Sequence, residues 1–210
     1  MSPNSHPPGA LQLGQVIDND DPESRGRVQV HLVALDLDLW CETMTPSAGE
    51  GYGMSVLPKL DELVVVGFLG PELPVVLGAL WRSSSQQPEQ ARPVEDNYLI
   101  KTPGGTELRM DDGTPSVEIK TQAGYRVLID EGSGEIKVER ESQSITLNSS
   151  AIEIRSSGQV TIDASTLSIS AGQVNIDAGM TQTSGVVQCS TLIAQLVNGT
   201  SYTPGAGNIW

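Results

Sequence analysis

Two pairs of adjacent carboxylates are the first residues in this sequence whose types and spacing could do chemistry. Asp20-Asp21 and Asp111-Asp112 resemble the paired acids that glycosidases use as general acid and base or nucleophile. Each pair lies beside a turn residue, Pro22 or Gly113, and turns are where Asp is most common. The chain also has no G-x-S-x-G sequence, so a serine nucleophile has no typical setting. We therefore predict no catalytic residues.

Histidines and cysteines are too few and too scattered to form a metal site. His31 is on the polar side of an alternating segment, and His6 is the only other imidazole. Cys41 and Cys189 are far apart in the chain, so we expect no disulfide between them. We interpret both as small buried hydrophobic residues. Asp163 and Asp177 are weak cation ligands at most. We predict no metal and no cofactor.

The charge of the chain limits its partners. The 210 residues include 26 Asp and Glu against 12 Lys and Arg, a formal net charge of −14, and no basic cluster. Binding to nucleic acid depends on basic side chains that displace counterions from phosphates, so it is disfavoured. No apolar run reaches the roughly 20 residues of a membrane span, and the first residues lack a signal-peptide pattern. We expect synthesis in the cytoplasm without a signal peptide. The strand patterns of the following segments predict an all-β fold.

The first 97 residues predict a small barrel between two irregular segments. Residues 1–10 are rich in Pro and polar residues and are expected to form a mobile N-terminal arm. Residues 11–81 contain five or six short strands bounded by Gly, Pro and Asp, which is typical of an OB-fold. The segment 63–68 is apolar on both faces and should be a central strand. Residues 82–97 are polar and form the linker.

Beyond the linker, an apolar-x-apolar triplet recurs eight times, with successive starts 10, 9, 9, 7, 8, 7 and 7 residues apart. Alternate residues of a strand share a face, so each triplet should direct two apolar side chains inward. The predicted core residues are Val117, Ile119, Val127, Ile129, Ile136, Val138, Ile145, Leu147, Ile152, Ile154, Val160, Ile162, Leu167, Ile169, Val174 and Ile176.

One chain cannot bury these triplets well, because it would form only about three coils around a thin core with open ends. Three identical chains wound together would bury them on a threefold axis, with every strand edge paired by a neighbouring chain. We therefore predict a homotrimeric, intertwined β-helix over residues 98–183. At about 4.8 Å per strand, the needle would be roughly 40 to 50 Å long. The shortening of the repeat towards the C-terminus predicts a taper.

Residues 184–210 depart from the triplet pattern, and glycines together with Pro204 are expected to prevent a regular continuation. Tyr202, Ile209 and Trp210 would give a trimer a blunt, apolar end, and exposed apolar patches of this kind usually bind a partner. Closure of the end by these residues themselves is the alternative.

The motifs of the barrel segment occur in a familiar order. They are Gly14-Gln-Val, Asp21-Pro22, Arg25-Gly-Arg-Val-Gln-Val30, Trp40, Pro46-Ser-Ala-Gly49, Gly51-Tyr-Gly53, Pro58, Asp61-Glu62 with the apolar run to Phe68, and Pro74-Val-Val-Leu-Gly78-Ala-Leu-Trp81. This segment resembles the OB domain of phage baseplate assembly protein V and of VgrG. Residues 101–112 resemble the strand that leads into the β-helix of those proteins. Leu60 and Thr106 depart from the family, which usually has Gly and His there.

The resemblance implies a non-enzymatic central spike of a contractile injection system. By this resemblance, the OB end would dock on a separate baseplate hub protein, and a PAAR-like tip protein would sit on the C-terminal end. The spike would be assembled into a tail or baseplate and delivered outside the cell on firing, where it would meet the target membrane transiently. Some phage spikes hold an axial iron ion with a His-x-His pair, which this chain lacks after position 31.

Two other functions fit parts of the sequence. An OB domain on a trimeric stalk could bind a surface glycan. A β-helical polysaccharide lyase would need acidic and basic residues gathered on one face, but Arg155 is the only basic residue after position 144. This scarcity counts against the lyase.

Overall fold

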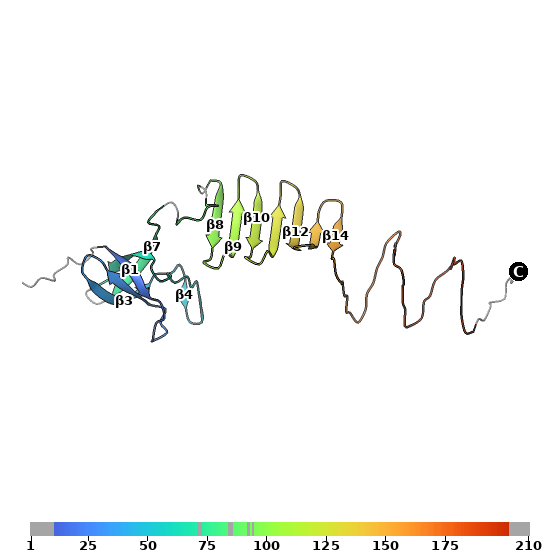
Figure 1. The fold of residues 1–210 in the computed structure, drawn as a ribbon, viewed down its shortest axis with the longest axis horizontal. Coiled ribbons are helices and arrows are strands. Elements are labelled where there is room, and N and C mark those ends of the chain that lie inside the picture. Colours follow the sequence, from blue (N-terminus) through green and yellow to red (C-terminus); the bar gives the residue numbers. More distant parts are fainter. Residues whose placement is uncertain (1–10, 71–72, 84–85, 92, 94, 202–210) are drawn as a thin grey trace, which may run out of the picture. The chain divides into compact units, whose positions relative to one another are not determined.

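The protein has an all-β fold in the computed structural model (Figure 1). The structure describes residues 11–70, 73–83, 86–91, 93 and 95–201. The chain divides into two units between Val160 and Thr161. The first unit contains a closed barrel, a two-stranded hairpin and a seven-stranded antiparallel sheet. The N-terminal arm predicted at residues 1–10 lies outside the described residues, as do Tyr202, Ile209 and Trp210.

Five strands close the barrel in the order β1-β2-β3-β7-β6. Their bounds are β1 Gln12–Asp18, β2 Val28–Leu32, β3 Leu37–Thr43, β6 Leu63–Phe68 and β7 Pro74–Leu80. The hairpin of β4 Ala48–Gly49 and β5 Tyr52–Gly53 lies between β3 and β6 in the chain. The strand β6 pairs with both β1 and β7, which confirms the central position predicted for it.

Alternating small apolar residues fill the barrel. Val28, Val30 and Leu32 of β2 are fully buried, as their alternation predicts. Gly14 of β1 lies so close to β2 that an added Cβ atom would be 2.2 Å from Val30 Cγ1, so only glycine fits there. Burial raises the pKa of the Cys41 thiol to about 11, which confirms that this cysteine is a core residue.

Asp21 organises the loop between β1 and β2. Its carboxylate accepts hydrogen bonds from the backbone N–H groups of Glu23, Arg25 and Arg27 and from the Arg27 guanidinium, at 2.8 to 3.2 Å. The Asp21 side chain is only 4% exposed. The hydrogen bond from Arg27, which outweighs burial, holds the pKa of Asp21 well below its usual range. The first acidic pair therefore has a structural role.

We predict that Asp21→Asn lowers the Tm of the barrel markedly, whereas Asp20→Asn does not. The amide cannot accept all the hydrogen bonds of the carboxylate, and it leaves the poorly exposed Arg27 with only the exposed Glu23 as a counter-ion. Asp20 is exposed, so its amide is a matched control with the same change in charge. Thermal melts by circular dichroism measure the effect, and equal melting temperatures for the two variants would contradict it.

Seven strands form the sheet, in the order β14-β13-β12-β11-β10-β9-β8. Their bounds are β8 Asn97–Lys101, β9 Glu107–Asp111, β10 Ser116–Lys120, β11 Arg126–Asp130, β12 Glu135–Arg140, β13 Gln143–Leu147 and β14 Ile152–Arg155. Every neighbouring pair is antiparallel and consecutive in the chain, so the sheet is a meander with one row of turns along each edge (Figure 1).

The turns of each row share local chemistry. In two turns of one edge, the Thr102 and Thr121 hydroxyls accept hydrogen bonds from the backbone N–H groups four residues later in the chain. Gly105 and Gly124 supply the positive φ of 82° that these turns need. The turns of the other edge use side-chain oxygens, a carboxylate in the first two and the Asn148 amide in the third. Asp111 Oδ1 accepts the Thr114 N–H at 2.9 Å. The second acidic pair thus begins a turn, as its neighbouring glycine predicts.

The pairing of these strands differs from the predicted one. The sequence predicts strands that alternate between chains, but over residues 97–155 each strand pairs with its own neighbour in the same chain. Repeats of 9 or 10 residues are long enough for a five-residue strand and a tight turn, so hairpins form locally. For this part of the chain, the prediction of chain-by-chain alternation is wrong.

The second unit, residues 161–201 as described, has a regular course without strand pairing within the chain. The chain bends at Ser165, Gly172 and Gly179, seven residues apart. It then bends at residues 185, 190, 195 and 200, five residues apart. The departure of residues 184–210 from the triplet pattern stays a prediction; over the described residues the spacing of the bends becomes shorter there. Cys189 is exposed in this unit, so the burial predicted for it is not seen in the single chain.

Candidate assembly interface

One face of the seven-stranded sheet is apolar and uncovered. The strand register places Val117, Ile129, Ile136 and Leu147 on this face, next to one another across β10 to β13. Each of the four is 38 to 45% exposed. All ten predicted core residues from 117 to 154 lie on this face and are exposed in the single chain.

The remaining predicted core residues, Val160, Ile162, Leu167, Ile169, Val174 and Ile176, are also exposed, by 56 to 71%. The triplets missed part of the apolar face. Tyr98 and Ile100 of β8 and Met110 of β9 extend it, and they are exposed too. In the sequence, the alternation of these three residues with polar ones is the pattern that could have identified them as part of the face.

The opposite face carries a ladder of ion pairs across β9 to β12. Arg109 Nη2 lies 3.0 Å from Glu118 Oε2, and Arg126 pairs with the other oxygen of the same carboxylate. Arg126 Nη1 also lies 2.8 Å from Glu139 Oε1, and Lys137 Nζ lies 2.7 Å from Glu139 Oε2. Most residues of this face are half-buried by one another. The central charges of this face are therefore paired within one chain, whereas the apolar side chains of the other face are uncovered.

The ladder changes the acidity of its members. Burial works to raise the pKa of Glu118, but the hydrogen bonds and charges of Arg126 and Arg109 together lower it. Hydrogen bonds from Lys137 and Arg126 lower the pKa of Glu139. A carboxylate whose pKa is lowered by folding stabilises the fold above its ordinary pKa, and this contribution is lost as the pH falls. The ordinary value for both residues is 4.5.

We predict that the sheet loses stability as the pH falls below 4.5, through protonation of Glu118 and Glu139. Glu118→Gln should be less stable than the wild type at pH 7 and should show a weaker dependence on pH below 4.5. Chemical unfolding monitored by circular dichroism at a series of pH values measures this. Parallel curves for variant and wild type would contradict the assignment.

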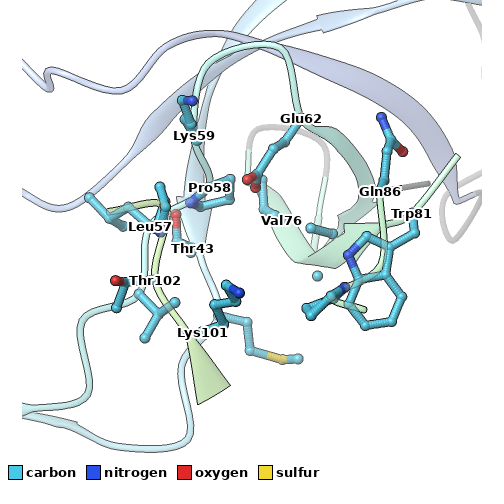
Figure 2. Close-up of a pocket in the computed structure, with 16 residues that line it drawn as sticks. Thr43, Leu57, Pro58, Lys59, Glu62, Val76, Trp81, Gln86, Lys101 and Thr102 are labelled. Atoms are coloured by element: carbon cyan, nitrogen blue, oxygen red, sulfur yellow. The ribbon is translucent and has the colours of Figure 1, made fainter. Parts of the chain in front are cut away.

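A pocket beside the barrel was also considered as a site. Figure 2 shows Trp81 and Gln86 on one side of it and Leu57, Pro58 and Thr43 on the other. Thr43 Oγ1 is buried and has no hydrogen-bond partner in the part of the chain that the structure describes. Glu62 is the only carboxylate among its lining residues, so the pocket does not bring paired acids together. Trp81 is 64% exposed in the single chain.

Neither a metal cluster nor a membrane-spanning helix is found in the described residues. No three His, Cys, Asp or Glu side chains are gathered there as a metal would require. Among the same residues, none forms a helix with the length and apolarity to cross a membrane.

Comparison with known families identifies the barrel. Residues 12–81, which span β1 to β7, match the model of the type VI secretion system/phage-baseplate injector OB domain. This match confirms the resemblance of the barrel motifs. No curated protein matches the chain. Residues 12–81 thus resemble an injector OB domain, and an antiparallel sheet follows them in the chain.

Proposed function

We propose that this protein is the homotrimeric central spike of a contractile injection system, which docks on the baseplate hub and pierces the target membrane. The observation that carries the proposal is the sheet whose charges are paired within one chain while its apolar face is exposed. The injector OB domain supports the setting, because its family is structural and in general non-enzymatic.

In the proposed trimer, three copies of the sheet over residues 97–155 form the faces of a triangular prism with their apolar sides inward. Each sheet alone exposes a row of Ile, Val and Leu, and burial of such side chains stabilises by about 1.5 to 3 kcal/mol each. Beyond residue 160 the three chains intertwine, because the backbone groups there lack partners within the chain and need those of a neighbour. The needle predicted over residues 98–183 would therefore be intertwined only in its C-terminal part.

The changing repeat gives the needle its shape. Hairpin repeats of 9 or 10 residues are followed by bends seven residues apart and then five residues apart. Fewer residues per strand make a thinner prism, so the proposed trimer tapers towards its C-terminal end. Intertwined chains resist unfolding under load, because no chain can leave without breaking hydrogen bonds to two others.

The partners of the spike follow from its two ends. The acidic OB domain, residues 11–81, would bind the hub after assembly in the producing cell. Residues 184–210 form the end nearest the tip, where Tyr202, Ile209 and Trp210 would receive a PAAR-like tip protein. The linker at residues 82–97 would connect the OB domain to the needle.

We predict that the purified protein has three times the chain mass of 22.2 kDa. The apolar face and the unpaired backbone of residues 161–201 both need a partner, and two further copies supply it. Light scattering coupled to size-exclusion chromatography measures the mass. A stable monomer at micromolar concentration would refute the trimer.

Adjacent residues of β13 provide a matched test of which face is inside. Ile145→Asp would place three carboxylates together in a dry core, where each unpaired charge costs several kcal/mol. Thr146→Asp places the same group on the opposite face, in contact with water, and should change the stability by about 0.5 kcal/mol or less. We expect loss of the trimer only for Ile145→Asp. Equal trimer yields would show that the apolar face is not the interface.

A further inference from the structure

The two turn edges of the sheet carry opposite charge. The edge formed by the turns β9–β10, β11–β12 and β13–β14 and by the residues before β8 is called here the acidic edge. It covers residues 95–97, 111–116, 130–135 and 147–152, which contain seven acids and no base. The other edge, called the basic edge, covers residues 101–107, 120–126, 140–143 and 155–159. It contains five bases and two acids.

Both edges have charges left over for a partner. Asp112 and Glu131 of the acidic edge are exposed and form no ion pair in the described part of the chain. Lys120 of the basic edge is exposed and likewise unpaired among the described residues. Arg140 is held 3.9 Å from Glu141, a carboxylate that is itself 79% exposed. These side chains differ from the central ladder, whose charges neutralise one another.

Arg140 is also positioned towards the apolar side. Along β12 it alternates in phase with Ile136 and Val138, so it lies at the margin of the apolar face. Its guanidinium lies 4.5 Å from the centroid of the Tyr125 ring and donates a hydrogen bond to the Tyr125 hydroxyl at 2.6 Å. Tyr125 thus holds the Arg140 guanidinium at the point where the basic edge meets the apolar face.

We propose that the basic edge of each sheet binds the acidic edge of the next copy, so that charge complementarity closes the ring of three sheets. This inference rests on the trimer proposed above. Rotation about a threefold axis with the apolar faces inward brings one edge of each sheet against the other edge of its neighbour, never like against like. On each edge the turns recur every second strand, about 10 Å apart, and the two edges are offset by one strand, so under a threefold rotation each turn of one edge lies between two turns of the other.

Charge reversal on one edge at a time tests the proposal. The acidic-edge variant is Asp112→Lys with Glu131→Lys, and the basic-edge variant is Lys120→Glu with Arg140→Glu. Among the exposed side chains without a strong ion pair, either variant places like charges against each other, and the four changes together restore opposite charges at these positions with the signs exchanged. Asp20→Lys with Glu50→Lys is the control for net charge, because both residues are exposed and lie in the barrel segment. Asp111 and Asp130 are left intact because their carboxylates accept hydrogen bonds within the turns.

The readout is the rate of trimer formation after dilution of full-length chains from urea, followed by light scattering at low and high salt. Steering by charge changes association rates by about 10-fold or more at low salt. We expect each single-edge variant to assemble about 10-fold more slowly than wild type, and the fourfold variant to recover to within about twofold. The differences should shrink in 1 M salt, where the screening length is about 3 Å.

Failure of the edge contact is distinguishable from failure of the trimer. If all variants form trimers at the wild-type rate, or if the fourfold variant does not recover, the edge contact is overturned while the trimer stands. If wild type is monomeric, both proposals fall. If EDTA slows wild-type assembly as much as reversal of the acidic edge does, that edge binds a divalent cation instead of a second copy, and the proposal is overturned.

Discussion

The amphipathic sheet of residues 97–155 is the constraint on which the rest of the structure depends. An isolated antiparallel sheet in water normally covers its apolar face with a helix or a second sheet, but this one leaves its Ile, Val and Leu side chains exposed. Its other face is already satisfied by ion pairs through Glu118 and Arg126. Charged residues that pair within the chain can remain against water, so the missing partner must cover the apolar side.

Two assembly modes follow one another along the chain, and the repeat length separates them. Hairpins form where the repeat leaves room for turns such as Thr102–Thr106, which close with their own hydrogen bonds. After Arg155 the bends are seven and then five residues apart, and the described residues form no hairpin there. In the proposed spike, pairing between chains satisfies this part of the backbone, so the spike changes from packed sheets to intertwined chains as it narrows.

Much of this could be predicted from local pattern. Alternation identified the buried Val28, Val30 and Leu32 of the barrel and the shared face of the eight triplets, because side-chain direction in a strand follows directly from sequence position. The pattern does not say which chain supplies the hydrogen-bond partner, so the pairing over residues 97–155 was predicted wrongly. The five-residue repeat was missed because Val187, Leu192 and Val197 are separated by polar residues and further apolar ones, which hide the period. The ion ladder depends on the register between strands, which single-strand patterns do not contain.

Disulfide cross-linking tests most directly whether three apolar faces meet on one axis. In a Cys189→Ser background, which removes the exposed native thiol, Ile145→Cys would bring thiols from different chains together, whereas Thr146→Cys would point them outward. Mild oxidation followed by non-reducing electrophoresis should link chains efficiently in the Ile145→Cys protein and only weakly in the Thr146→Cys protein. Equal linking of the two variants, or linking through position 146 alone, would contradict an assembly built on the apolar face.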